Sequence, residues 1–265
     1  MNKNEIDESN FQFLSMWKRL AGDHPGANLA DEPGLSMRWA DNAFAFWNAL
    51  YLTEQISDAE HLRTRLTTAQ RYMKSKQHDG LVYVCEDYLS ASLLEQMETI
   101  VDSTGLVFAL HLTGMVGNLL PFAEHNLHPA LTFKRAENEE ILQAYADINS
   151  AGYGLPLAAG RAGLMGSDLW RSSAYAYVGY DNGVPVSTSA AIVNDGQLYL
   201  ALVATLPEAQ RKGFGHATVR HALQCAYEAT GLTRTSLHAT EAGAPVYERI
   251  GYHRVTRFRA YMPKP

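Results

Sequence analysis

Two short turns place the strongest constraint on the fold of the C-terminal half. Asp181-Asn-Gly183 and Asn194-Asp-Gly196 each separate two strand-like runs. Asn-Gly and Asp-Gly pairs readily adopt the positive φ angles that two-residue hairpin turns require. The spacing therefore predicts an antiparallel meander of three strands over residues 175–180, 184–193 and 197–205.

Further elements of this half follow from hydrophobic pattern and turn residues. Before the meander we expect a strand and then a helix with an acidic first turn, followed by a loop rich in Gly and Ala; these are residues 131–135 and 137–150. After the meander we expect a helix, a strand, a short helix and a last strand, at residues 213–230, 235–239, 243–250 and 253–262. The order combines antiparallel strands with one crossover helix.

The N-terminal half gives a weaker pattern. Residues 22–34 are rich in turn formers and follow an expected N-terminal helix. Residues 35–120 have the pattern strand, helix, strand, helix, strand, which includes a helical run at 90–102. A second polar, turn-like stretch covers residues 121–129. Since 265 residues exceed the usual size of one domain, we expect an N-terminal helix and linker (1–34), a smaller α/β domain (35–125) and a second domain (131–265).

Composition excludes several classes of protein. Hydrophobic residues make up 46% of the chain and charged residues 19%, which argues against a disordered, collagen-like or coiled-coil chain. The net charge of −6 argues against a broad nucleic-acid-binding surface, and no apolar run is long enough to span a membrane. Neither cysteine, Cys85 or Cys225, belongs to a CxxC pair, so we expect reduced thiols and a cytoplasmic location.

The segment from Val203 to His216 has the features of an anion site. A buried-looking strand leads through a turn into a helix that begins near Gly213 and Gly215. Glycines let the backbone approach an anion, and the unpaired amides at a helix N-terminus attract negative charge. Arg211 and Lys212 add positive charge. The alternative is an ordinary helix start after a basic turn.

Two other phosphate motifs do not fit the same segment. The P-loop pattern GxxxxGK followed by Ser or Thr is absent. The dinucleotide fingerprint needs a third glycine where this sequence has Thr218, and the preceding strands are hairpin-linked instead of parallel. A metal site at His125 and His128 lacks the further ligands that it would need, so solvated linker histidines are favoured there.

Two motifs in this half resemble a known family. Gln210-Arg-Lys-Gly213-Phe-Gly215 is similar to the central signature of the GNAT superfamily of acyl-CoA-dependent N-acetyltransferases. Downstream, the run from Leu237 to Tyr252 resembles the strand, helix and "Tyr, three residues, Gly, aromatic" ending of that family. The resemblance covers roughly residues 131–265. It implies a GNAT-like α/β fold: a mixed, mostly antiparallel sheet with flanking helices, preceded here by the smaller α/β domain.

The resemblance also implies an acyl donor site. The pantetheine of acetyl-CoA would pair with a strand end that separates from its neighbour, and the pyrophosphate would lie on the following amides. The cofactor-binding residues so implied are Val203, Ala204, Thr205, Gln210, Arg211, Lys212, Gly213, Phe214, Gly215, His216 and Thr240. Tyr247 would be the acid that protonates the departing thiolate, the alternative being a packed helix aromatic.

The sequence departs from the family pattern in two places. Thr240 stands where many members have an Asn, and the strand 198–203 lacks the carboxylate that serves some members as general base. His238, Glu241 and Asp168 are candidate bases by position, although each is equally explained as a structural or surface residue; a water chain is another route.

These features together predict direct transfer of an acetyl group from acetyl-CoA to an amine of a small molecule or peptide, with no metal, nucleic acid or membrane partner. A non-catalytic acyl-CoA-binding or regulatory protein is the alternative, and a nucleotide-binding module a third. The N-terminal half has no Gln/Arg-x-x-Gly-x-Gly pattern in residues 1–130. We expect it to be a degenerate acetyltransferase-like copy that binds no CoA and shapes the acceptor pocket, or else an unrelated packing domain. The acceptor and the oligomeric state do not follow from the sequence.

Overall fold

The computed structural model describes residues 3–118, 128 and 131–264, and divides the chain into two compact units. The first unit comprises Met1–Gly114, Ala239–Ala242 and Arg254–Pro265, and the second comprises Met115–His238 and Gly243–His253. The expected boundary at 125–131 falls largely outside the described residues, so the division into 1–34, 35–125 and 131–265 stays a prediction. No helix within the described ranges is long and apolar enough to cross a membrane.

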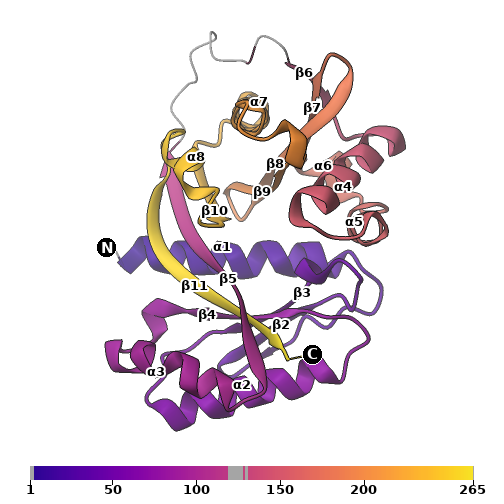
Figure 1. Cartoon of the computed structure of the whole chain (residues 1–265). Helices are drawn as coiled ribbons and strands as arrows, with labels where there is room; N and C mark the ends of the chain where they lie inside the picture. Colours follow the sequence, from indigo (N-terminus) through magenta and orange to yellow (C-terminus); the bar gives the residue numbers. More distant parts are fainter. Residues whose placement is uncertain (1–2, 119–127, 129–130, 265) are drawn as a thin grey trace. The chain divides into compact units, whose positions relative to one another are not determined.

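The first unit is an α/β structure whose strands lie in the order β1-β2-β3-β4-β11-β5 (Figure 1). Its helices are α1 (Lys3–Gly22), α2 (Ala59–Lys74) and α3 (Ala91–Asp102). Its strands are β1 (Asp31–Glu32), β2 (Leu35–Trp39), β3 (Asn48–Leu52), β4 (Leu81–Cys85), β5 (Leu106–Asn118) and β11 (His253–Pro263), the last two reaching the limit of the unit. β2 and β3 are antiparallel, β3 and β4 are parallel, and β4 and β11 are antiparallel.

Both faces of this sheet are covered because the strands are apolar on both sides. Leu50 and Val82 belong to the core that α2 and α3 close. The alternate residues Tyr51 and Tyr83 point to the other face, where the ring of Phe13 from α1 contacts both. Figure 1 shows α1 on one side of β2–β4 and the other two helices on the opposite side.

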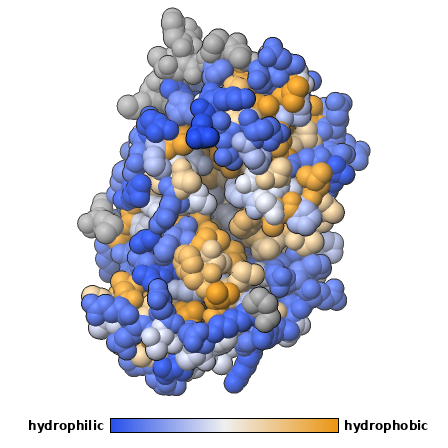
Figure 2. Space-filling view, in the orientation of Figure 1, coloured by the Kyte–Doolittle hydropathy of each residue, from blue (hydrophilic) through white to orange (hydrophobic). Residues whose placement is uncertain are grey.

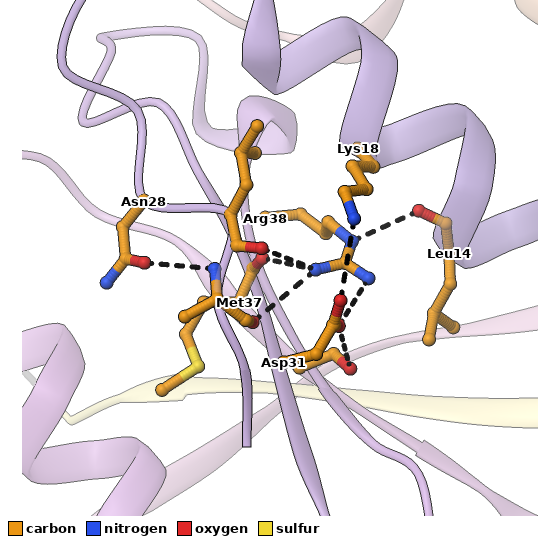
Figure 3. Close-up of polar contacts among 9 residues, drawn as sticks. Leu14, Lys18, Asn28, Asp31, Met37 and Arg38 are labelled. Atoms are coloured by element: carbon orange, nitrogen blue, oxygen red, sulfur yellow. Dashed lines mark hydrogen bonds and ion pairs between the residues drawn. The ribbon is translucent and has the colours of Figure 1, made fainter.

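A buried arginine joins α1 to this sheet (Figure 3). Arg38, only 4% exposed, donates hydrogen bonds to the carbonyl oxygens of Leu14 at 3.2 Å and of Met37 at 2.7 Å. Its guanidinium also forms an ion pair with Asp31 at 2.6 Å. A charge is tolerated in the interior only when such partners satisfy it, so these contacts fix the helix against β2.

The pattern expected for residues 35–120 was wrong at its beginning. A second strand, β3, follows β2 before the first helix of that segment. The intervening aromatic stretch forms a loop that the side chain of Asn48 closes through hydrogen bonds with the backbone of Asn42, at 3.1 Å and 2.7 Å. The helix expected at 90–102 is confirmed as α3, with the Ser90 hydroxyl accepting from the Leu93 amide at 3.3 Å.

The second unit contains the predicted meander. Its strands are β6 (Leu131–Arg135), β7 (Ala174–Asp181), β8 (Val184–Asn194), β9 (Gln197–Thr205) and β10 (Arg234–Ala239), adjacent in the order β10-β9-β8-β7-β6. Asp181 pairs with Val184 and Asn194 with Gln197, so both hairpins close with two-residue turns. All four turn residues, 182, 183, 195 and 196, have positive φ, as the sequence predicted.

The helices of the second unit are α4 (Glu139–Tyr153), α5 (Leu157–Leu164), α6 (Leu169–Ser172), α7 (Phe214–Thr230) and α8 (Ala244–Glu248). The crossover helix α7 connects β9 to the parallel strand β10. The Gly- and Ala-rich loop expected after residue 150 was wrong, because this segment forms α5 and α6. Gly160 lacks a side chain where α5 meets Ser150 of α4, and its amide donates to the Ser150 hydroxyl at 3.0 Å. Packing thus outweighs the low helix propensity of glycine.

Helices α4 and α7 cover opposite faces of the meander. Asn149 of α4 donates a hydrogen bond to the Thr188 hydroxyl at 3.1 Å, whereas the neighbouring residue Ser187 contacts Thr218 of α7 at 2.7 Å. Successive side chains on a strand point to opposite faces, so these two contacts identify the two faces. On the side of the molecule shown in Figure 2, hydrophilic residues predominate and hydrophobic ones form separate groups.

Candidate acyl donor and catalytic site

A β-bulge interrupts β9 near its C-terminal end. Ala190 pairs with Ala201 and Thr188 pairs with Ala204, so Leu202 and Val203 together oppose one residue of β8. Leu202 has a φ of 53°, which is rare for a branched side chain. A bulge bends its strand and redirects the adjacent backbone groups, and this one lies immediately before the predicted donor-binding residues Val203–Thr205.

Hydroxyl groups hold the carbonyl oxygens of the bulge. Tyr145 donates to the carbonyl oxygen of Leu202 at 3.2 Å, and the Thr188 hydroxyl donates to the same oxygen at 3.1 Å. Tyr153 donates to the carbonyl oxygen of Val203 at 3.0 Å. Because a backbone carbonyl without a partner is costly when buried, these contacts stabilise the irregular backbone at Leu202 and Val203.

Strands β9 and β10 part before this bulge. Among the described residues, the register pairs between them are Thr235 with Leu198 and Ser236 with Tyr199. β9 then continues to Thr205 alongside β8. The edge of β9 that faces β10 is therefore not in the ladder from Leu200 onward, and main-chain groups on such an edge can pair with an extended ligand.

The loop after β9 turns into the start of α7. Arg211 and Gly213 both have positive φ, at 63° and 83°. Gly213 is the N-cap of α7, and no side chain caps this helix start. By contrast, α3 of the first unit is capped by Ser90. The first amides of the 17-residue helix α7 therefore remain for a ligand.

The same loop folds back against the end of β9. Gln210 donates through Nε2 to the carbonyl oxygen of Thr205 at 3.3 Å. A β-carbon at Gly215 would lie 2.8 Å from Oγ1 of Thr205, so only glycine fits without a shift. The buried ring of Phe214 packs edge-on against His128, with 5.0 Å between ring centroids. The structure thus brings Thr205, Gln210 and Gly215 together.

Positive charge surrounds this helix start. Arg211 and Lys212 are exposed in the loop. Burial, together with the nearby cations Arg220 and Arg249, lowers the pKa of His216. A histidine whose pKa falls because of neighbouring cations lies in a positive potential, and such a potential favours a phosphate group.

Tyr247 lies on α8, half-buried, with its ring 6.1 Å from that of Tyr252. Burial raises its pKa, and Tyr153 and Tyr252 raise it further. The electrostatic influence of Tyr153 indicates that Tyr247 lies near the bulge, since Tyr153 binds the Val203 carbonyl. A raised pKa keeps the phenol protonated at neutral pH, as a proton donor requires.

The remaining predicted residues lie elsewhere or in less suitable surroundings. Thr240 is exposed and belongs to the first unit, as does Glu241, whose carboxylate forms an ion pair with Arg257 at 3.0 Å. Asp168 is 97% exposed and lies 4.0 Å from Arg171. His238, in the second unit, contacts the hydroxyl of Tyr199 through Nδ1 at 2.8 Å.

Sequence reasoning missed the hydroxyls that hold the bulge. Tyr153 had been considered only as one side chain of a flexible segment, and Tyr145 not at all. The spacing of Tyr145, Asn149 and Tyr153 was the available signal, because residues four apart share one face of a helix. Within the described residues, no three His, Cys, Asp or Glu side chains gather to hold a metal; His125 lies outside those residues.

Comparison with known proteins agrees with this geometry. Residues 172–254 match the family model "Acetyltransferase (GNAT) domain". A solved structure described as a GCN5-related N-acetyltransferase from Kribbella flavida has a TM-score of 0.67 at 17% identity, covering 96% of this chain and 95% of that chain. Another such structure, from Sphaerobacter thermophilus, has a TM-score of 0.60 at 13% identity, covering 95% and 90%.

No curated protein sequence matches the chain significantly. At these identities the structural likeness establishes the fold, and the family match covers the part of the chain that contains the bulge, α7 and α8. The resemblance found from the two sequence motifs and the mixed, mostly antiparallel fold are thereby confirmed.

Proposed function

We propose, from the match of residues 172–254 to a GNAT acetyltransferase domain, that the protein transfers an acetyl group from acetyl-CoA to an amine of a small molecule or peptide. The observation that carries the proposal is the bulge at Leu202 and Val203 where β9 parts from β10. It is followed directly by an uncapped helix start. A strand edge for an extended chain and an adjacent anion site suit the two ends of a pantetheine pyrophosphate.

The residues at this site suit each part of the donor. The edge of β9 from Val203 to Thr205 offers main-chain groups to the pantetheine amides. The amides that follow Gln210, with Gly213 and Gly215 leaving room for close approach, suit the pyrophosphate. The charges of Arg211 and Lys212 and the positive potential at His216 act in the same direction.

The reaction we propose is direct transfer. The amine nitrogen attacks the thioester carbonyl carbon, the C–N bond forms, and a backbone amide near Val203 stabilises the negative oxygen. The C–S bond then breaks, and the sulfur takes the bonding electrons and a proton from Tyr247. The nitrogen loses one proton, and solvent reprotonates Tyr247. The products are an amide and CoA with a free thiol.

Thermal unfolding with and without acetyl-CoA tests the donor site, with ATP and NAD as controls. A ligand at about 100 times its Kd stabilises by roughly 2.7 kcal/mol. Each kcal/mol shifts Tm by about 2–4 °C at this size. We expect a shift of several degrees with acetyl-CoA alone. No shift with any of the three ligands would overturn the proposal.

A matched variant locates the binding. Arg211→Asn removes the charge but retains a residue that accepts the positive φ of this position. We expect a smaller shift with acetyl-CoA in this variant and an unchanged Tm without ligand. Equal shifts in both proteins would mean that the ligand binds elsewhere.

One observation favours the non-catalytic alternative: β9 carries no carboxylate from Gln197 to Thr205 that could act as a base. Release of the CoA thiol from acetyl-CoA over a broad amine panel separates the two functions. A transferase accelerates this release with at least one amine, whereas a binding protein leaves it at the uncatalysed rate.

A further inference from the structure

His238 and Tyr199 form a polar pair on the two strands that part at the candidate site. The Tyr199 hydroxyl lies 2.8 Å from Nδ1 of His238, and the two rings are nearly parallel, at 16°. Resting on the proposed acetyl transfer, we propose that His238 accepts the proton that the attacking amine loses, and that Tyr199 positions its imidazole. No base had been assigned to the reaction, and the pair supplies one within the second unit.

The strand register puts His238 level with the bulge. Ser236 is the last residue of β10 paired with β9, opposite Tyr199. Two residues further along, His238 corresponds to Ala201, which directly precedes Leu202. The imidazole is therefore carried at the point where the strands have separated and the bulge begins.

The pair also lies on the same face as the groups that hold the bulge. Ile192 and Ala190 pair with Tyr199 and Ala201, and residues paired across strands share a face. Both are an even number of residues from Thr188, whose hydroxyl receives the Asn149 amide of α4. Tyr199 therefore faces α4, the helix that also provides Tyr145 and Tyr153 to the bulge carbonyls.

The surroundings of His238 suit transient protonation. Burial lowers its pKa to about 3, so the imidazole is neutral before the reaction. As the C–N bond forms, the attacking nitrogen becomes positively charged and passes its proton to Nε2. Nδ1–H then donates to the Tyr199 oxygen, which stabilises the imidazolium, and Nε2 afterwards returns the proton to solvent. The two other candidate bases are mainly exposed to solvent.

His238→Asn tests this role most directly, because the asparagine amide retains a partner for Tyr199 near the Nδ1 position but cannot take a proton. The assay follows CoA thiol release from acetyl-CoA with hydroxylamine, a small amine that is neutral near neutral pH. We expect kcat to fall on the order of 10²-fold, with an unchanged thermal shift from acetyl-CoA. His238→Ala should show the same loss and recover activity when imidazole is added.

The matched control is His221→Asn. His221 is also half-buried with a lowered pKa, but it lies on α7, with its ring stacked on Phe133 at 4.2 Å. This control should retain wild-type kcat. Full kcat in His238→Asn, or a loss that imidazole does not restore in His238→Ala, would overturn the assignment of His238. Absence of an acetyl-CoA shift in the wild type would instead overturn the proposed function.

Discussion

Gly215 lies so close to Thr205 that a β-carbon at position 215 would be 2.8 Å from Oγ1 of the threonine. This contact sets the distance between the end of β9 and the first turn of α7. The two segments are the ones to which we assign the pantetheine and the pyrophosphate, so their spacing determines whether one donor molecule can reach both.

Gly215→Ala should therefore weaken acetyl-CoA binding. Overpacking of this kind costs about 1–3 kcal/mol, which corresponds to about 5- to 150-fold in Kd if the displaced loop bears the cost. Calorimetric titration with acetyl-CoA measures it. Thr205→Ala combined with Gly215→Ala removes the obstructing atom and should recover most of the affinity. Equal Kd values for the wild type and Gly215→Ala would contradict the assignment of this helix start.

Tyr247→Phe should reduce turnover without changing donor binding. The substitution retains the ring and removes the phenolic proton, so we expect kcat to fall on the order of 10²-fold. Because burial raises the Tyr247 pKa, wild-type activity should show no alkaline decline from this group near neutral pH. Tyr252→Phe is the control, since its hydroxyl contacts Thr235 at 2.9 Å. Equal kcat values for Tyr247→Phe and the wild type would remove Tyr247 from the chemistry.

The elements that the sequence predicted well are those with local signals. The bounds predicted for residues 131–135 and 197–205 agree with β6 and β9, and those of β7 and β8 differ by one residue at an end. Asx-Gly turns and strand alternation act within a few residues of one another, so a single sequence contains them. The uncapped start of α7 at Gly213 was likewise accessible from its glycines.

The bulge was not accessible in this way. Nothing in the letters around Leu202 indicates a positive φ, which leucine rarely adopts. The conformation is held by Tyr145, 57 residues away, and by Tyr153 acting on the next residue. Such contacts depend on how α4 packs over the sheet, and this packing also turned the glycine-rich segment after residue 150 into α5.

The candidate base depends on strand register as well. Tyr199 and His238 are 39 residues apart, and only the parallel alignment of β9 with β10 brings their side chains together. Sequence position alone placed His238 in the same class as Glu241 and Asp168. The structure separates them by burial and by partner.

Arg38→Met should destabilise the first unit. Loss of the guanidinium leaves the carbonyl oxygens of Leu14 and Met37 without this donor, and it leaves Asp31 without its closest cation. We expect a loss of about 3 kcal/mol, measured by urea unfolding. Arg63→Met is the control, because Arg63 is exposed and its pairing with Glu60 contributes little. Similar midpoints for the two variants would mean that Arg38 does not fasten α1.

Asp41→Asn should lower stability in a pH-dependent way. Asp41 has a φ of 51°, which asparagine also accepts, so the substitution changes mainly the charge. Burial alone would raise the Asp41 pKa, but the amides of His78 and Gln77 donate to its carboxylate, at 3.0 Å and 3.1 Å, and the net pKa is lowered.

A carboxylate whose pKa is lower in the folded state stabilises the protein above its unfolded pKa, 3.8 for an ordinary Asp. This contribution disappears as the pH falls through the folded pKa. The wild type should thus be more stable than Asp41→Asn by about 1 kcal/mol near pH 7, and the difference should vanish well below pH 3.8. Urea midpoints across this range measure it. A difference that stays constant with pH would show that the amide itself, and not the lost charge, alters the loop.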